Sequence, residues 1–292
     1  MTKLISINKK ISFFKKKTIS VEGDKSLSIR FILLSSLSKG KCIGKNLLKS
    51  EDVVSSINII RKLGIKIKLK NKNCEVHGKG LNGFRYKRNI ILNAGNSGTT
   101  ARLICASVID TRHHIKITGD KSLRKRDMER IIKPLSKFGA KFESNNKKLP
   151  IKIIGPKKLK PIFYNEKLGS AQCKSAVMIA ALKTEGKTKI KCKPSRNHTE
   201  LMFKKVLKIP IKVRKLKKSE FIEIDGLNEF NNFDYKIPGD ISSASFFIVL
   251  TLLSKNSFLT IKEVNINPSR TGIITILNKM GAQIKFLNKR NY

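Results

Sequence analysis

The chain has 292 residues, of which 40% are hydrophobic, and 63 Lys and Arg residues face only 20 Asp and Glu, giving a formal net charge of +43. No stretch approaches the ~20 consecutive apolar residues that a membrane-spanning helix needs, and residues 1–17 lack the apolar core of a secretion signal. Five scattered cysteines without a CxxC spacing, and four histidines without a ligand pattern, disfavour a disulfide framework or a zinc site and predict a cytoplasmic protein.

The positive charge admits two readings. Clustered Lys and Arg would favour a nucleic-acid partner, because they release counterions from phosphates. Here the lysines are spread along the whole chain, Trp is absent, and no aromatic stripe accompanies the basic residues. This distribution favours a compositional bias over a nucleic-acid surface, and a basic cleft for small anionic substrates fits the charge as well.

An internal repeat organises the chain, since four segments begin with Gly and small polar residues and continue into an apolar run. The opening glycines, at positions 23, 95, 169 and 239, are 72, 74 and 70 residues apart. In each repeat we expect a buried first helix, since its residues are apolar nearly all round. The four predicted helices begin at Gly23-Asp-Lys-Ser-Leu-Ser-Ile-Arg30, Gly95-Asn-Ser-Gly-Thr-Thr-Ala-Arg102, Gly169-Ser-Ala-Gln-Cys-Lys-Ser-Ala176 and Gly239-Asp-Ile-Ser-Ser-Ala-Ser-Phe246.

The second half of each unit also repeats. Short apolar strands are predicted at 115–117, 188–190 and 259–261, and amphipathic helices that end at Gly are predicted at 53–64, 128–139 and 272–281. Further strands are expected at 65–69 and 140–143. Each unit therefore reads as helix, strand, helix and strand pair.

The starts of the four first helices predict an anion site. Backbone N–H groups at a helix N-terminus lack intrahelical acceptors and carry the positive end of the helix dipole. Several such helices that point the same way would converge on one anion. The alternative, that their Ser and Thr residues serve only as N-caps, is adequate for one helix but not for four with the same opening.

Individual side chains strengthen this prediction. Ser26 and Arg30 are four residues apart, hence on one helical face, with Lys25 at the helix start. The segment 95–102 combines Gly98, which allows close approach of a ligand to the backbone, with a hydroxyl at Thr99 and a fork of donors at Arg102. Arg126 ends a basic run that could close on a phosphate or carboxylate.

Seven strings in this order resemble successive signatures of the 5-enolpyruvylshikimate-3-phosphate synthase family, and together they cover nearly the whole chain. They are 23–30, 95–103, Gly119-Asp-Lys-Ser-Leu-Arg-Lys-Arg126, 169–176, Ser195-Arg-Asn-His-Thr-Glu200, Pro238-Gly-Asp-Ile-Ser-Ser-Ala244 and Asn267-Pro-Ser-Arg-Thr-Gly272. The resemblance implies the α/β enolpyruvyl transferase fold, in which each domain is an inside-out α/β barrel of three helix-strand-helix-strand units. It also implies transfer of the enolpyruvyl group of phosphoenolpyruvate to the 5-hydroxyl of shikimate 3-phosphate by a monomer without metal or cofactor, in chorismate and aromatic amino acid biosynthesis.

The resemblance assigns roles to residues of the quoted strings. Lys25 would contact phosphoenolpyruvate and take part in proton transfer, and Asp52 matches an acidic position that the family keeps near the site. Asn96, Gly98 and Arg126 would line the phosphoenolpyruvate site. The residues expected to hold shikimate 3-phosphate are Ser26, Arg30, Ser170, Ala171, Gln172 and Arg196. Asp240 begins a helix and fits a cap as well as a site residue.

The sequence also departs from the family's pattern. Asp127 follows Arg126 where Pro is usual, and Asn197 replaces an Asp. The family has six repeats and this sequence shows four, so we expect a complete domain at 21–237, a partial second domain at 1–20 plus 238–292, and exposed apolar surface on the fourth repeat. Later family motifs, including the Asp base, are absent.

Other functions were weighed against this one. The sister transferase that acts on UDP-N-acetylglucosamine normally has a Cys in the loop matched by 119–126, and none is present here. A basic nucleic-acid-binding protein is a further alternative. The last is a catalytically incomplete fragment that binds shikimate 3-phosphate or needs a complementing C-terminal chain.

Overall fold

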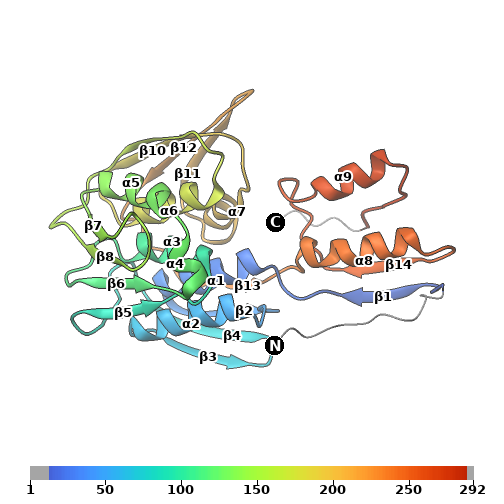
Figure 1. The fold of residues 1–292 in the computed structure, drawn as a ribbon, viewed down its shortest axis with the longest axis horizontal. Coiled ribbons are helices and arrows are strands. Elements are labelled where there is room, and N and C mark those ends of the chain that lie inside the picture. Colours follow the sequence, from blue (N-terminus) through green and yellow to red (C-terminus); the bar gives the residue numbers. More distant parts are fainter. Residues whose placement is uncertain (1–12, 288–292) are drawn as a thin grey trace. The chain divides into compact units, whose positions relative to one another are not determined.

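The computed structural model describes residues 13–287, so the predicted segments at 1–12 and 288–292 lie outside the described residues. The chain divides into two compact units, which are described separately. The large unit comprises residues 23–237, and the described part of the small unit comprises residues 13–22 and 238–287 (Figure 1).

The large unit contains three successive repeats of helices and strands. The first repeat consists of α1 (Lys25–Leu37), β2 (Lys39–Lys45), α2 (Glu51–Lys62), β3 (Lys66–Lys70) and β4 (Asn73–Lys79). The second consists of β5 (Ile90–Asn93), α3 (Gly98–Ser107), β6 (Ile115–Thr118), α4 (Lys121–Lys125), α5 (Glu129–Lys137), β7 (Lys141–Ser144) and β8 (Ile151–Ile154). The third consists of β9 (Phe163–Glu166), α6 (Ala171–Leu182), β10 (Lys187–Cys192), α7 (His198–Leu201), β11 (Ile211–Lys215) and β12 (Glu220–Asp225), and β13 (Asp234–Lys236) follows it.

The predicted order of helices and strands is confirmed, with one difference in the third repeat. There, α7 has only four residues and continues into a π-helical turn, Met202–Val206, in place of the single longer helix of the first two repeats. Pro210 lies four residues beyond this turn, where the missing N–H and fixed φ of proline disfavour a continuing helix.

Each repeat has a four-stranded sheet, and one sheet is completed by a strand from a distant part of the chain. In the second and third sheets, the strand that precedes the first helix pairs in parallel with the strand that follows it, β5 with β6 and β9 with β10. In the first sheet this position is taken by β13, which pairs in parallel with β2 and so closes the large unit with residues 234–236. The strand that precedes α1 in sequence, β1 (Lys17–Ser20), pairs instead within the small unit.

The core of the large unit is built around α1, α3 and α6, which confirms their predicted burial. In α1 every residue from Leu27 to Leu37 is buried, and in α6 every residue from Cys173 to Leu182. Strands cover this core with one face and present lysines on the other. In β10, for example, Thr188, Ile190 and Cys192 are buried while the lysines between them are exposed. Much of the positive charge therefore lies on solvent-facing sides of strands, as alternation in half-buried sheets requires.

The small unit pairs β1 in parallel with β14 (Leu259–Lys262) and adds the helices α8 (Ile241–Leu253) and α9 (Gly272–Lys279). The predicted burial of the fourth helix is wrong in this chain, because only Ile241 and Ala244 of α8 are buried. Phe246 and Leu253 are more than three-quarters exposed. The expected exposure of apolar surface on the fourth repeat is thus present, since α8 has only a few apolar neighbours, such as Ile261 and Val264, to pack against.

Two further properties bear on the chain's surroundings. Among residues 13–287 no helix combines the length and apolar character needed to cross a membrane. All five cysteines are buried and unpaired. Burial raises the pKa of the Cys74 and Cys105 thiols to about 12 and that of Cys192 to about 11.

We therefore predict that the native protein does not react with Ellman's reagent at pH 8. The thiolate is the reactive form, and burial raises the pKa of all five thiols, so few of them are ionised at that pH. Absorbance at 412 nm should rise by five equivalents only after unfolding in guanidinium chloride. Fast reaction of even one thiol in the native state would contradict the buried cysteine arrangement.

Candidate anion site at three helix N-termini

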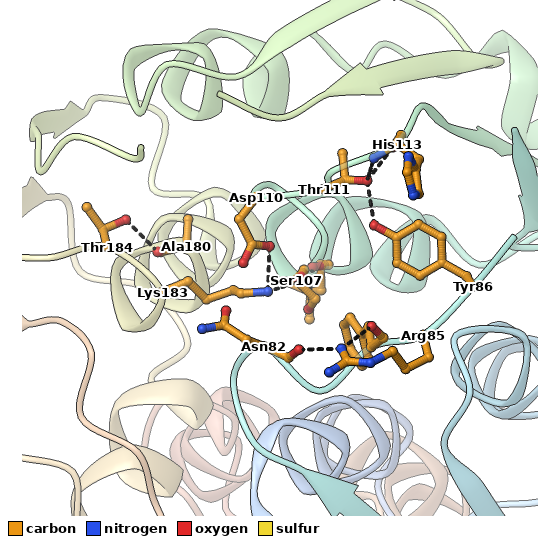
Figure 2. Close-up of polar contacts among 12 residues, drawn as sticks. Asn82, Arg85, Tyr86, Ser107, Asp110, Thr111, His113, Ala180, Lys183 and Thr184 are labelled. Carbon is orange, nitrogen blue, oxygen red and sulfur yellow. Dashed lines mark hydrogen bonds and ion pairs between the residues drawn. The ribbon is translucent and has the colours of Figure 1, made fainter. Parts of the chain in front are cut away.

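The helices α3 and α6 run side by side in the same direction. At their starts, the Gln172 side chain donates to Thr99 Oγ1 at 2.9 Å. At their ends, Lys183 Nζ donates to the carbonyl oxygen of Ser107 at 3.0 Å and pairs with Asp110 at 2.5 Å (Figure 2). Contacts at both ends fix a parallel arrangement, so the N-terminal dipole ends of both helices lie together.

The start of α1 joins this group through α2. Lys25 Nζ at the start of α1 lies 2.8 Å from Asp52 Oδ2 in the first turn of α2. The backbone oxygen of Asp52 accepts from Thr100 Oγ1 of α3 at 3.5 Å, and Thr100 is linked to Ser56 of α2 at 2.6 Å. The predicted convergence is therefore present for the first turns of α1, α3 and α6, whereas α8 belongs to the small unit.

Each of these helices begins with a side-chain cap that its sequence predicts. Asp24 accepts from the N–H of Leu27 at 3.0 Å, Ser97 from Thr100 at 3.3 Å, and Ser170 from Cys173 at 3.3 Å. A cap satisfies only one of the four N–H groups that a helix start leaves without an intrahelical partner. The caps therefore fix where the helices begin without consuming their capacity to bind an anion.

Arg30 is held by two hydroxyl groups from other elements. Its guanidinium donates from Nε to Thr199 Oγ1 at 2.9 Å and from Nη2 to Ser175 Oγ at 3.0 Å. A third bond runs from Nη1 to the backbone oxygen of Ser26 at 3.1 Å. Arg30 is 4% exposed, so this cation is largely removed from water, and these hydrogen bonds orient it.

A second cluster joins α3, α4 and α6. Arg126 donates to Asn96 Oδ1 at 3.0 Å, and Asn96 donates to Asp120 at 2.6 Å. Arg102 Nη1 donates to the side-chain oxygen Oε1 of Gln172 at 2.8 Å. A Cβ on Gly98 would lie 2.9 Å from Arg102 Nη1 and 3.2 Å from Arg126 Nη1. Gly98 thus allows both guanidinium groups to approach the start of α3.

The site has more positive than negative charge. The pKa of Arg102 is lowered, first by burial and then by the neighbouring charges of Arg130 and Arg126. An arginine stays ionised in proteins, so this shift means that the charged guanidinium is destabilised by its surroundings. Its Nε is buried and has no hydrogen-bond partner among residues 13–287. An anion bound here would relieve both conditions.

The carboxylate of Asp127, where the family pattern has proline, is engaged locally. Its Oδ1 accepts from the N–H of Glu129 at 2.8 Å at the start of α5. Its backbone oxygen accepts from Arg102 Nη2 at 3.4 Å. Asp127 thus orders the start of α5 while its backbone contributes to the position of Arg102.

The remaining predicted residues lie at helix starts or in loops. Ser170 and Ala171 begin α6, where Ser170 serves as the cap. Arg196 is exposed in the loop that precedes α7. Asp240, in the small unit, caps α8 by accepting from Ser242 N–H at 2.8 Å, and it pairs with Arg270 at 3.0 Å.

Four side chains of the site have no substrate assigned from the sequence. They are Thr99, Arg102, Ser175 and Thr199. Thr99 and Arg102 were recognised as donors in their string, and the structure connects both to Gln172. Thr199 and Ser175 lie inside quoted strings but were given no role, although both contact Arg30. In the sequence, only their closeness to assigned residues indicates a role: Thr199 lies three residues after Arg196, and Ser175 lies three residues after Gln172. In residues 13–287, no three His, Cys, Asp or Glu side chains are grouped as metal ligands.

We predict that Arg102→Gln weakens binding of inorganic phosphate by about tenfold or more, the loss expected for one hydrogen bond from a charged donor. Isothermal titration calorimetry at fixed ionic strength measures the change. Arg214→Gln, which removes an exposed cation paired with Glu223 on a distant strand, is the matched control and should leave phosphate binding unchanged. Equal losses in both variants would show that net charge, rather than this site, attracts the anion.

Comparisons with known proteins identify the family of this chain. The family model described as EPSP synthase (3-phosphoshikimate 1-carboxyvinyltransferase) matches residues 14–291. Relatives named 3-phosphoshikimate 1-carboxyvinyltransferase, from Thermoanaerobacter sp. (strain X514) and Petrotoga mobilis, are 42% and 43% identical over 280 and 277 residues, which are 95% and 93% of this chain. The chain spans 64% and 63% of the length of these relatives.

A solved EPSP synthase from Acinetobacter baumannii superposes with a TM-score of 0.86 at 34% identity, covering 96% of this chain and 62% of that one. This likeness confirms the predicted fold class, the α/β enolpyruvyl transferase fold. The family match over nearly the whole chain confirms the resemblance drawn from the seven strings. The chain belongs to the EPSP synthase family.

Proposed function

We propose that this chain takes part in transfer of the enolpyruvyl group of phosphoenolpyruvate to the 5-hydroxyl of shikimate 3-phosphate, on the pathway to chorismate and the aromatic amino acids. A proton adds to the enol CH₂ carbon, and the substrate hydroxyl attacks the adjacent carbon and gives up its proton. The tetrahedral intermediate then loses a methyl proton and inorganic phosphate, which restores the carbon–carbon double bond. The names of the relatives, 3-phosphoshikimate 1-carboxyvinyltransferase, support this reaction.

The observation that carries the proposal is the shortage of negative charge where the first turns of α1, α3 and α6 meet. Both substrates are anions, and each carries a phosphate and a carboxylate. Buried Arg30 and Arg102, together with free helix-start N–H groups, suit such ligands. In a site shielded from water, these preorganised cations also stabilise charge that develops in the transition state.

We assign the residues to the two substrates by their matches to the family's strings. Those proposed to hold shikimate 3-phosphate are Ser26, Arg30, Ser170, Ala171, Gln172 and Arg196. Those proposed for phosphoenolpyruvate are Lys25, Asn96, Gly98 and Arg126. Gln172 contacts both Thr99 and Arg102, which supports a place between the two substrates.

Lys25 and Asp52 are the proposed acid–base pair, together with the electrostatic contribution of Arg126. Their charged groups are 2.8 Å apart, and both side chains are partly accessible, so a proton can pass between the pair and a bound substrate. Asp52 is also anchored through its backbone to α3. This anchoring keeps the Lys25 ammonium close to the start of α3, where Asn96 and Gly98 are proposed to bind phosphoenolpyruvate.

Three broader features of the family reading are also proposals. The large unit would be one complete three-repeat domain, and the small unit would be part of the second. The protein would act as a monomer in the cytoplasm, where its free thiols remain reduced. It would need neither a metal nor a cofactor, and neither nucleic acid nor a membrane as a partner.

The alternative proposal is that this chain binds shikimate 3-phosphate but needs a complementing chain for turnover. It is favoured by the location of every assigned substrate residue within residues 23–237. Substrate binding and turnover are therefore separable measurements.

We predict that the purified chain binds shikimate 3-phosphate and that Arg30→Gln weakens this binding by about tenfold to a hundredfold, because a charged donor to the phosphate is lost. Calorimetry measures the binding, and release of inorganic phosphate from the two substrates measures turnover. Turnover that Lys25→Ala abolishes would establish the transferase activity. Binding without turnover would favour the complementing-chain alternative, and absence of binding would contradict the proposed function.

A further inference from the structure

Lys174 is a fully buried cation near the start of an apolar helix. It lies on α6, its side chain is 0% exposed, and its neighbours in sequence from Ala176 to Leu182 are apolar. Its Nζ lies 2.5 Å from Oε1 of Glu200 on α7 and 3.5 Å from Oε2 of Glu220 on β12. The three charged groups thus connect α6, α7 and the third sheet.

Stability does not account for this arrangement. Removing three charges from water is costly, and well-packed apolar residues in place of a buried ion pair are often neutral or stabilising. Burial acts to lower the pKa of Lys174, but attraction to Glu200 and a hydrogen bond that Lys174 donates to Glu200 outweigh it, so the pKa is raised and the lysine stays charged. The second oxygen of Glu200 is buried without a hydrogen-bond partner in the described part of the chain. A buried charge cluster that adds little stability indicates a role in fixing the positions of neighbouring groups.

The geometry leads directly to Arg30. Glu200 is adjacent in sequence to Thr199, and Lys174 is adjacent to Ser175. The hydroxyls of Thr199 and Ser175 lie 2.7 Å apart, and each accepts a bond from the Arg30 guanidinium. The Lys174–Glu200 pair and the Ser175–Thr199 pair therefore join α6 to α7 at two successive positions, and the second pair orients the buried arginine.

We propose that Lys174 is a positioning residue for the anion site, which holds Glu200 so that Thr199 and Ser175 fix the Arg30 guanidinium in its binding orientation. The proposal rests on the proposed function for the identity of the anion, shikimate 3-phosphate. Its geometric part, that Lys174 controls the orientation of Arg30, does not depend on that identity.

The chain provides a matched control on the same helix. Lys183, at the other end of α6, is 2% exposed and pairs with Asp110 at 2.5 Å (Figure 2). It contacts the end of α3, away from the helix starts. Lys174→Met and Lys183→Met therefore both remove a buried paired lysine from α6, and only the first touches the network of Arg30. Glu200→Gln and Asp110→Asn form a second, milder pair in case the lysine variants do not fold.

The first readout is the Arg30 Nε–Hε signal in ¹H–¹⁵N spectra of the chain without ligand, assigned with Arg30→Gln. We expect Lys174→Met or Glu200→Gln to shift this signal and to speed its exchange with water, since the bond to Thr199 is loosened. Lys183→Met and Asp110→Asn should leave it in place. An unchanged signal in the Lys174 and Glu200 variants, or equal changes in the control pair, would overturn the proposal even if the chain binds no shikimate 3-phosphate.

The second readout is a double-mutant cycle on shikimate 3-phosphate affinity. We expect Lys174→Met and Thr199→Val each to weaken binding by about tenfold, and the double variant to be little worse than either alone, because both act through Arg30. Losses that multiply would show that Lys174 does not act through Thr199. Failure of the unsubstituted chain to bind, with the Arg30 signal still dependent on Lys174, would contradict the proposed substrate and retain the positioning role.

Discussion

Parallel packing of three apolar helices, with their N-termini at one end, is the constraint on which the rest of the large unit depends. Aligned helices repel one another through their dipoles unless charge compensates at the ends. At the far end, Lys183 supplies a cation to the Ser107 carbonyl and to Asp110. At the near end Asp52 is paired with Lys25, and buried Arg30 and Arg102 add positive charge. The positive charge at the N-terminal end of the three helices therefore favours binding of an anion there.

The shared anion site and the buried helices could be predicted from the sequence, because the same pattern occurs in each repeat. One Gly/Ser/Thr-rich helix start is ambiguous between a cap and a binding site, whereas three such starts at similar spacing indicate a shared site. Apolar character all round predicted the burial of α1, α3 and α6. It misled for α8, because burial requires neighbouring elements to pack against, and the described neighbours cover only Ile241 and Ala244.

Other features had no local signal. The pairing of β13 with β2 joins residues almost two hundred positions apart, and no property of Asp234–Lys236 specifies that partner. Periodicity could not indicate that Arg30 is oriented by Thr199 and Ser175, since all three lie on different elements or turns. Lys174, like Arg30 and Arg102, is a charge within an apolar helix, and its partners Glu200 and Glu220 come from elsewhere in the third repeat. Long-range pairs of this kind are set by tertiary packing.

The most direct test of the account is a titration of the ¹⁵N-labelled chain with shikimate 3-phosphate, followed by backbone amide shifts. If the starts of α1, α3 and α6 form one anion site, the largest shifts will fall together in their first turns, around Ser26, Thr99 and Gln172, with a single dissociation constant. Shifts spread over the exposed lysines of the strands, or confined to one helix start, would contradict a shared site at the three helix N-termini.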